Sequence, residues 1–222
     1  NDSLVGVRDP QGFRPLCLGK TENGYVLSSE SCALDAIKAE FIRHIDPGEM
    51  VIIDDSGVRS VIYAEPEKID KKLCVFEYIY FARGDSHIDG QSVYQSRLNM
   101  GRELYNETKY DADIVMSIPD SGTTAALGYA RASGIPFAEG LIKNRYSGRT
   151  FIKPNQEERE LAVRMKLNAM PEVVGGKRIV LIDDSIVRGT TSGLIVKMLK
   201  EAGAKEIYMC VSSPAIEYFC HY

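Results

Sequence analysis

The sequence lacks several features that would each indicate a class of protein. Its 222 residues contain no apolar run near the ~20 residues of a transmembrane helix, and its first residues do not resemble a signal peptide. It has no basic excess, since 27 Lys and Arg stand against 31 Asp and Glu, which argues against a general nucleic-acid binder. It also has no internal repeat and no low-complexity segment. With 44% hydrophobic and 26% charged residues, the chain has the composition of an ordinary globular protein of one or two domains.

Paired cysteine motifs are absent as well. The five cysteines are widely and irregularly spaced, and no C-x-x-C pair occurs, so the sequence offers no local zinc ribbon and no thioredoxin-type motif. An odd number of scattered cysteines is typical of thiols in a reducing compartment rather than of a disulfide framework. We therefore expect a cytoplasmic protein.

The local pattern of the first 65 residues is β-rich. Short apolar runs at residues 4–8, 15–19, 24–28, 50–54 and 58–63 alternate with polar turns, and one short helix is expected at residues 32–38. Asn23-Gly24 and Asp55-Ser56-Gly57 are hairpin-type turns between such runs. This pattern predicts the antiparallel β part of an α+β domain.

After residue 65 the pattern changes to alternating strands and helices. Helices are expected at residues 93–106, 123–134 and 192–202, and strands at residues 114–118, 137–142, 178–182 and 207–211. This alternation predicts an α/β domain, with a parallel sheet flanked by helices. Ligands of such folds bind beyond the carboxyl ends of the strands, so the strand-to-helix loops are the place to look for chemistry.

The most informative loop follows the expected strand at residues 178–182. Two adjacent carboxylates, Asp183 and Asp184, end the strand, and Gly189, Thr190 and Thr191 open the next helix. Free N–H groups, the helix dipole and hydroxyls at a helix start favour a phosphate, and a glycine lets the backbone approach it closely. The two carboxylates suit a pair of ribose hydroxyls or a hard cation. An ordinary helix cap after a solvated strand end remains the alternative for each part taken alone.

As a whole, residues 178–192 resemble the phosphoribosyl-pyrophosphate (PRPP) signature of type I phosphoribosyltransferases. Residues 76–83 (FEYIYFAR), 117–122 (SIPDSG) and 143–152 (KNRYSGRTFI) narrow the resemblance to the glutamine PRPP amidotransferases. The resemblance covers essentially the whole chain. It implies a type I phosphoribosyltransferase fold at residues 66–222, preceded at residues 1–65 by the β-rich C-terminal part of an N-terminal-nucleophile glutaminase domain.

The activity implied by this resemblance is the formation of 5-phosphoribosylamine from PRPP and glutamine-derived ammonia, with release of pyrophosphate and glutamate, in purine biosynthesis. Asp183 and Asp184 would act at the ribose or at Mg²⁺, with Ser121 beside the metal. Lys143 and Arg145, together with Tyr146, belong to a cationic loop that would neutralise the leaving group and cover the site. The residues expected to bind PRPP are Asp120, Ser121, Gly122, Ser185, Ile186, Val187, Arg188, Gly189, Thr190, Thr191 and Ser192.

The cysteines have different expected roles under the resemblance. The glutaminase nucleophile of the family is an N-terminal Cys, and because residue 1 is Asn we expect the chain to be a piece of a longer enzyme that cannot hydrolyse glutamine alone. Cys17 and Cys32 are not expected to be nucleophiles. One branch of the family carries a 4Fe–4S cluster, and Cys74 and Cys220 stand where two of its four ligands lie.

Two other functions remain open at this stage. A catalytically silent regulator of the same fold would sense PRPP or purines, and a base phosphoribosyltransferase would use a purine or pyrimidine in place of ammonia. The absence of a helix-turn-helix and of a basic stripe argues against the regulator. The resemblance further implies purine nucleotide feedback inhibitors and a homo-oligomer, either tetramer or dimer, with neither nucleic acid nor a membrane as partner.

Overall fold

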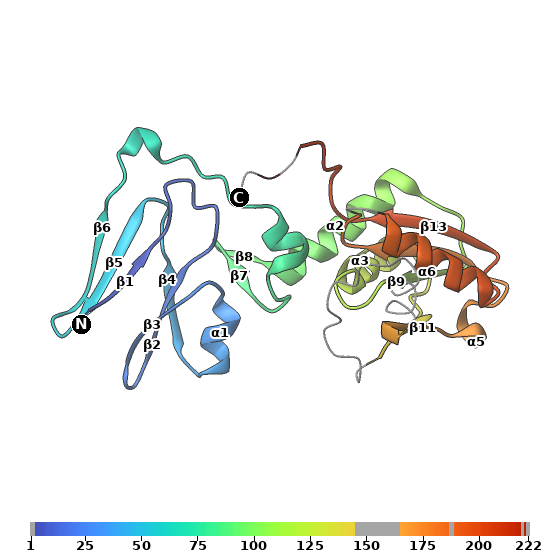
Figure 1. The fold of residues 1–222 in the computed structure, drawn as a ribbon, viewed down its shortest axis with the longest axis horizontal. Coiled ribbons are helices and arrows are strands. Elements are labelled where there is room, and N and C mark those ends of the chain that lie inside the picture. The colour runs from blue at the N-terminus through green and yellow to red at the C-terminus, as the bar shows by residue number, and fades with distance from the viewer. Residues whose placement is uncertain (1–2, 145–164, 187–188, 219, 221–222) are drawn as a thin grey trace. The chain divides into compact units, whose positions relative to one another are not determined.

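The computed structural model describes residues 3–144, 165–186, 189–218 and 220. The chain forms two compact units, Asn1–Ser96 and Arg97–Tyr222, which are described separately below (Figure 1). Arg145, Tyr146, Val187 and Arg188, four of the expected site residues, lie outside the described residues. None of the helices in the described part of the chain is long and apolar enough to cross a membrane.

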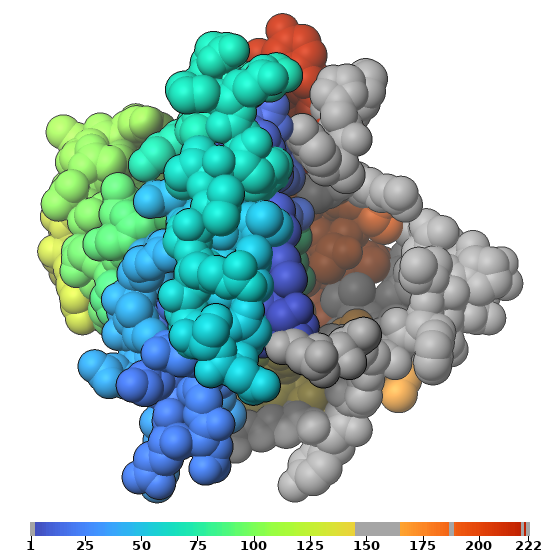
Figure 2. Space-filling view, turned by 90° about the vertical axis from the view of Figure 1, so that its left-hand side faces the viewer, coloured from blue at the N-terminus to red at the C-terminus, as the bar shows by residue number. Residues whose placement is uncertain are grey.

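The N-terminal unit contains two three-stranded antiparallel sheets, with strand orders β1-β5-β6 and β3-β2-β4. A core of Leu18, Ile45 and Val51 joins them, and Gly6 faces Leu27 so closely that a Cβ on Gly6 would lie 2.5 Å from a Leu27 methyl carbon. The surface of this unit is coloured blue to teal in Figure 2. Its elements are β1 (Ser3–Val7), β2 (Cys17–Thr21), β3 (Gly24–Ser28), α1 (Ser31–Ala36), β4 (Glu40–His44), β5 (Glu49–Asp54) and β6 (Gly57–Ile62).

On its other face the β1-β5-β6 sheet exposes an apolar patch beside the Arg59–Asp54 ion pair. Val5 pairs with Ile52, and Met50 pairs with both Val7 and Val61, so these side chains share the face opposite the buried Val51. Val5, Val7 and Val61 are 48%, 52% and 46% exposed. A contiguous apolar sheet face of this kind is typical of a surface that another layer covers.

Residues 66–96 are attached to the N-terminal unit by a series of polar contacts. The N–H groups of Asp70, Lys72 and Cys74 donate to the carbonyls of residues 10, 11 and 13. Arg8, which is 3% exposed, donates two hydrogen bonds of 2.9 Å to the carboxylate of Asp89. This segment contains the 3₁₀ turn η1 (Pro66–Lys68), the π-helix η2 (Glu77–Phe81), β7 (His87–Ile88) and β8 (Gln91–Ser92).

These contacts explain why the compact unit ends at Ser96 rather than near residue 65. The boundary between two compact units need not coincide with the boundary between two catalytic domains. The expected division into residues 1–65 and 66–222 therefore stays a prediction.

The C-terminal unit is built around a three-stranded parallel sheet with strand order β13-β12-β9. This confirms the α/β architecture with a parallel sheet flanked by helices. Its elements are α2 (Val93–Thr108), which begins in the first unit, β9 (Ile114–Ser117), α3 (Thr123–Ser133), β10 (Leu141–Lys143), β11 (Leu167–Ala169), α5 (Pro171–Val174), β12 (Arg178–Asp183), α6 (Thr190–Glu201) and β13 (Glu206–Val211).

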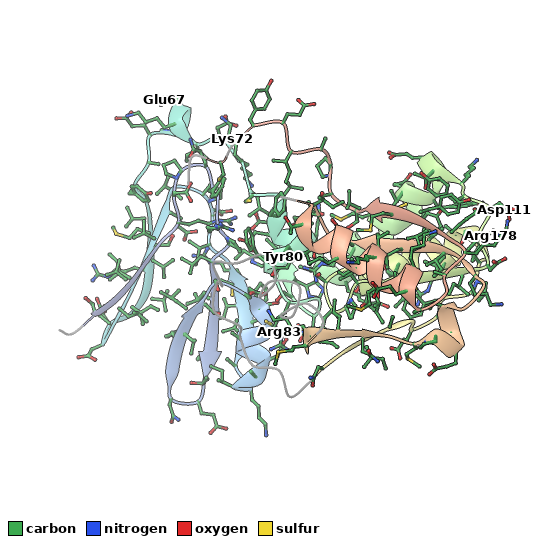
Figure 3. The ribbon with its side chains drawn as sticks, turned by 45° about the vertical axis from the view of Figure 1, so that its right-hand side comes forward. Glu67, Lys72, Tyr80, Arg83, Asp111 and Arg178 are labelled. Carbon is green, nitrogen blue, oxygen red and sulfur yellow. The ribbon has the colours of Figure 1, made fainter. Side chains whose placement is uncertain are left out.

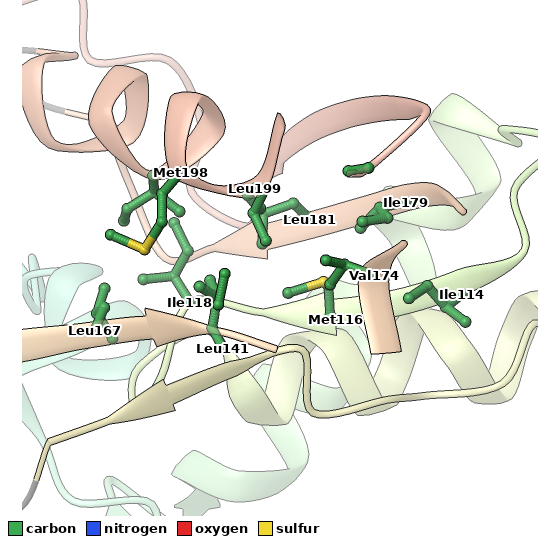
Figure 4. Close-up of a cluster of buried hydrophobic side chains, with 13 residues drawn as sticks. Ile114, Met116, Ile118, Leu141, Leu167, Val174, Ile179, Leu181, Met198 and Leu199 are labelled. Carbon is green, nitrogen blue, oxygen red and sulfur yellow. The ribbon is translucent and has the colours of Figure 1, made fainter. Parts of the chain in front are cut away.

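The middle strand β12 is buried on both faces. Ile179 and Leu181 pack into a cluster that includes side chains from α6 (Figure 4). Val180 and Ile182 pack into a second cluster, which includes side chains from α3. All four are 0% exposed. A parallel strand covered by helices on both sides is expected to read as a continuous apolar run, and β12 does so. At the N-terminal end of β12, Arg178 forms ion pairs with Asp111 and Asp113 (Figure 3).

The expected strand at residues 137–142 is wrong as a single element. Phe137 forms only an isolated parallel bridge to Val115, and β10 pairs antiparallel with β11 in a separate two-stranded ladder. Gly140 lies between them, where a Cβ would be 2.7 Å from a Val174 methyl carbon. A glycine in close contact inside an apolar run interrupts the strand.

Two glycines let helices α2 and α3 approach each other closely. A Cβ on Gly101 would lie 1.9 Å from the carbonyl oxygen of Ala125, and one on Gly128 would lie 2.1 Å from that of Leu98. Both neighbours are backbone atoms, which cannot rotate out of the way. The helices therefore have to separate if either glycine is replaced.

Glu49 is the most densely hydrogen-bonded carboxylate of the N-terminal unit. It is 2% exposed and accepts bonds from both terminal nitrogens of Arg43, from the Asp46 N–H at 2.7 Å and from the Ser60 hydroxyl. The Arg43 guanidinium is the main cause that lowers the pKa of Glu49 from 4.5 to about 2. The ionised carboxylate is thus tied to the fold.

We expect Gly101→Ala to destabilise the protein by about 3 kcal/mol, as overpacking against backbone does. Gly193→Ala is the matched control, because Gly193 lies in helix α6 with nothing within 4 Å of a Cβ. It should stabilise the protein by roughly 0.5–1 kcal/mol, since Ala favours a helix. Thermal and urea unfolding measure both changes. Equal effects of the two variants would contradict the close packing of α2 and α3.

We expect Glu49→Gln to reduce the stability at neutral pH by about 2 kcal/mol, because it removes charge-assisted bonds from a buried acceptor. Since the pKa of Glu49 is lowered on folding, its stabilisation is present above pH 4.5 and is lost as the pH falls towards 2. The difference between wild type and variant should therefore shrink over that range. Urea unfolding at a series of pH values measures it, and a pH-independent difference would show that the charge is unimportant.

Candidate functional site

The site lies at the edge of the parallel sheet where strands β9 and β12 end. Ser117 and Ile182 are partners in the register of these strands, and the Ile118 N–H donates to the Ile182 carbonyl at 2.9 Å. Gly122 packs against the same place, since a Cβ there would lie 2.4 Å from the Ile182 oxygen and 3.1 Å from the Asp183 Cα. Only a residue without a side chain allows this approach. The loop at residues 118–122 and the end of β12 are thereby brought into direct contact.

Asp183 and Asp184 are held rigidly at the end of β12. The N–H groups of Ser212 and Ser213 donate to the carbonyls of Asp183 and Asp184 at 3.0 and 2.9 Å, and the Ser185 hydroxyl donates to the Asp184 carboxylate at 2.7 Å. Asp184 is 8% exposed, whereas Asp183 is partly open to solvent.

Burial raises the pKa of Asp183 to about 6, and the neighbouring Asp184 carboxylate contributes to the rise. Two ionised carboxylates at one strand end repel each other and are poorly solvated there. A cation or a pair of hydroxyl donors would relieve both costs, so the arrangement favours such a ligand.

The start of helix α6 has the backbone expected of an anion site. Gly189 precedes the helix with φ of +71°, a conformation that other residues rarely adopt. Thr190 and Thr191 form the exposed first turn. The Ser192 hydroxyl donates to the Gly189 carbonyl at 3.0 Å. Ser192 thus shapes the turn, and the exposed side chains of Thr190 and Thr191 suit a phosphate at the helix start.

The loop at residues 118–122 connects β9 to helix α3, which begins at Thr123. Asp120 is exposed, Ser121 is half-buried and Gly122 is buried. A contact that the sequence reasoning missed crosses the base of this loop, where the Ser117 and Thr123 hydroxyls lie 3.1 Å apart. The only signal for it in the sequence is a pair of hydroxyl residues, one at the last strand position and one at the first helix position.

Lys143 brings the third expected segment to the same loop. It ends strand β10, and its ammonium group forms an ion pair with the Asp120 carboxylate. The next residue, Asn144, donates its N–H to the Lys166 carbonyl at 2.7 Å, which extends the β10–β11 ladder by one bond. The structure therefore brings Lys143 to the loop at residues 118–122.

The residues at this edge fit a hard divalent cation. Asp183, Asp184 and Ser121 offer oxygen ligands, and Mg²⁺ is commonly held by one or two carboxylates together with substrate phosphates and water. In the described part of the chain no group of three or more His, Cys, Asp or Glu side chains is placed to hold a metal alone. A magnesium ion at this site would therefore depend on a phosphorylated ligand for the rest of its coordination.

The residues of this chain do not by themselves fit a 4Fe–4S cluster, which needs four thiolates. Cys17, Cys32 and Cys210 are buried. Burial raises the pKa of the Cys17 and Cys210 thiols to about 11, which is unfavourable for a thiolate ligand. Cys74 is half-buried and Cys220 is exposed, and they lie in different units. No step of the chemistry below involves a cluster.

The segment at residues 76–83 belongs to the N-terminal unit rather than to this edge. Arg14 pairs with the buried Glu77 at 2.5 Å and lies 4.6 Å from the ring centroid of Phe81. Together with Pro15, Ser29 and Glu30 these residues line an open pocket of about 350 Å³. Residues 76–83, one of the segments that resemble glutamine PRPP amidotransferases, therefore belong to the β-rich unit.

Comparison with known proteins agrees with this geometry. The model of the phosphoribosyl transferase domain matches residues 99–215. The chain is 55% identical, over its whole length, to the amidophosphoribosyltransferase of Archaeoglobus fulgidus and covers 48% of that protein. It is 52% identical to the Bacillus subtilis enzyme of the same name, over 99% of the chain and 46% of the relative. The chain thus spans about half the length of the curated relatives it matches.

A solved structure of the glutamine PRPP amidotransferase from B. subtilis, complexed with ADP and GMP, matches 99% of this chain and 48% of its own with a TM-score of 0.91 and 51% identity. A structure described as the allosteric regulatory enzyme of purine biosynthesis matches equally well, with a TM-score of 0.91. The similarity to glutamine PRPP amidotransferases that the sequence motifs indicated is therefore confirmed. By its matched domain, the chain belongs to the phosphoribosyl transferase domain family.

Proposed function

We propose that this chain carries the PRPP-using site of an amidophosphoribosyltransferase. In the reaction, ammonia displaces pyrophosphate from C1 of the ribose of PRPP and gives 5-phosphoribosylamine. The observation that carries the proposal is the meeting of two loops at one sheet edge, where Gly122 packs against Ile182 and Asp183. The loop after β12 contributes two carboxylates and a helix start suited to a phosphate. The loop at residues 118–122 is exposed and has Lys143 beside it.

The reaction requires a site that positions the substrate and stabilises charge, and it does not require strong acids or bases. Loss of pyrophosphate leaves positive charge on the sugar ring, as in glycosyl transfer generally. The first turn of α6, with Gly189, Thr190 and Thr191, would hold the 5′-phosphate. Asp183 and Asp184 would fix the ribose hydroxyls and face the developing positive charge. Lys143 would neutralise the pyrophosphate as it leaves.

When bound, Mg²⁺ would neutralise oxygens of the pyrophosphate group, and Asp183, Asp184 and Ser121 are the residues that would hold it. Asp183 is suited to this because burial and the adjacent Asp184 carboxylate raise the pKa of its carboxyl, a cost that a bound cation would relieve. The remaining expected residues, Arg145, Tyr146, Val187 and Arg188, are proposed to act in the same site by resemblance alone.

We propose that the ammonia comes from glutamine in another part of a longer protein, and that residues 1–65 complete a glutaminase domain there. The exposed apolar face that includes Val5, Val7 and Val61 supports this, because a further layer of that domain would cover it. Cys17 is unsuited to be the glutaminase nucleophile, since burial raises the pKa of its thiol, whereas a nucleophile needs a lowered one. Within the longer protein, Cys74 and Cys220 are proposed as two of four cluster ligands.

The remaining expectations extend the same proposal. The relative solved with ADP and GMP supports regulation by purine nucleotides. A homo-oligomer, tetramer or dimer, and a cytoplasmic location follow from the proposed enzyme class. The two alternatives differ from it in turnover: a silent regulator would bind PRPP without releasing pyrophosphate, and a base transferase would require a purine or pyrimidine. The sequence identity of 55% and 52% to two amidophosphoribosyltransferases extends over both units of the chain, which favours the amidotransferase.

We expect Asp183→Asn combined with Asp184→Asn to lower kcat/KM for PRPP roughly a thousandfold in the full-length protein, because both groups that face the ribose and the metal lose their charge. The assay measures pyrophosphate release from PRPP and ammonia, which bypasses the glutaminase. Glu206→Gln, at the opposite end of the neighbouring strand β13, is the control and should retain full activity. Unchanged kcat/KM in the double variant would refute the assignment.

We expect Gly189→Ala to raise the KM for PRPP about fivefold, because the strained φ of +71° is relieved by a shift of the helix start that costs about 1 kcal/mol of phosphate binding. Gly176→Ala is a matched control, since Gly176 has φ of +70° and open space around its Cα but lies before strand β12, away from the site. Both variants should lose similar stability. A similar rise in KM for both would contradict a specific role of Gly189.

A further inference from the structure

The ion pair between Asp120 and Lys143 joins two residues that were both expected to serve the same anionic ligand. Asp120 lies in the loop between β9 and α3, and Lys143 ends β10. Both side chains are open to solvent, since the Lys143 side chain is 53% exposed and that of Asp120 is 74% exposed. The pair therefore forms at the accessible surface of the site and not in the core.

The position of Asp120 is unusual for a loop that binds pyrophosphate. A carboxylate opposes the approach of an anion, and here it also occupies the cation that would receive that anion. The neighbouring backbone does not require a carboxylate, because the loop is fixed elsewhere, by the Ile118 N–H bond to Ile182 and by the Ser117–Thr123 hydroxyl contact. The charge of Asp120 is thus explained by its partner rather than by the fold.

The exposure of the pair limits its strength. Ion pairs between exposed side chains are weak, because water screens them and the side chains lose conformational freedom. Pyrophosphate carries several negative charges and can replace a single carboxylate on Lys143. The pair is therefore strong enough to weaken anion binding several-fold but too weak to prevent it.

We propose that Asp120 competes with pyrophosphate for Lys143 and so limits how tightly the site retains this product. The inference rests on the proposed function, because it takes pyrophosphate as the leaving group. As pyrophosphate departs, the Asp120 carboxylate takes its place on the ammonium group, so that Lys143 is not left without an anionic partner. Asp120 is then a residue that tunes product release and not a direct ligand of PRPP.

The test is titration calorimetry of the full-length protein with inorganic pyrophosphate, without magnesium, so that metal binding does not enter. Asp120→Asn should lower the Kd for pyrophosphate about two- to fivefold, the range that an exposed ion pair can supply. Asp120→Glu, which keeps the carboxylate, should bind as the wild type does. Asp111→Asn breaks an exposed pair with Arg178 at the opposite end of β12 and should leave the Kd unchanged (Figure 3).

A double-mutant cycle separates competition from simple repulsion. If Asp120 acts through Lys143, Asp120→Asn has no effect on the Kd in the Lys143→Met background. The same tightening in that background would overturn the inference, because the carboxylate would then repel pyrophosphate directly. Unchanged binding by Asp120→Asn would also overturn the inference, since Asp120 would then have no effect on pyrophosphate. Weaker binding would overturn it because Asp120 would then be a ligand. Failure of the wild type to bind pyrophosphate even after Mg²⁺ is added would instead refute the proposed function, so the two failures are distinguishable.

Discussion

Burial of strand β12 on both faces is the constraint on which the proposed site depends. Ile179, Val180, Leu181 and Ile182 are removed from solvent, alternately against the clusters that include α6 and α3. Each such side chain contributes roughly 1.5–3 kcal/mol relative to exposure. A strand fixed this firmly cannot shift its register, because a slip of one residue would carry Arg178 or Asp183 into the buried stretch. Its end, and with it Asp183, has one position.

The chemistry of the site follows from what is attached to this fixed end. Asp183 and Asp184 emerge where the sheet stops, and Gly122 permits the loop after β9 to contact them because it has no side chain. Lys143 reaches the same loop from β10 through Asp120. Three segments that are far apart in the sequence thus meet through a register, a glycine and an ion pair. None of these contacts needs a bound ligand, so the site is organised in advance, as electrostatic stabilisation of a reaction requires.

Much of this could be predicted from the sequence, because the deciding signals are local. The apolar run of β12 predicts the parallel sheet, and the carboxylates after it with the hydroxyl-rich helix start predict the edge that we propose to be functional. The resemblance then supplied roles that the residues alone left open. The structure also corrected details that local patterns do not contain. The apolar run at residues 137–142 divides at Gly140, because that glycine lies against Val174 from elsewhere in the chain.

The extent of the N-terminal unit was the least predictable part. The change of pattern near residue 65 is real, but residues 66–96 attach to the β-rich unit through long-range contacts such as Arg8 with Asp89 and Arg14 with Glu77. The two residues of each pair are far apart in the sequence, so no local pattern predicts that they meet. The π-helix that carries Glu77 was likewise not expected, because its pattern is short and apolar.

The central claim, that the edge of the sheet at Asp183 and Gly189 transfers a phosphoribosyl group to ammonia, is tested most directly by the stoichiometry of turnover. The full-length protein is supplied with PRPP, Mg²⁺ and ammonium salt without glutamine, and pyrophosphate and 5-phosphoribosylamine are measured together. The account predicts that both form in equal amounts and that neither forms without ammonia. Pyrophosphate release that is absent, or that does not depend on ammonia, would contradict it.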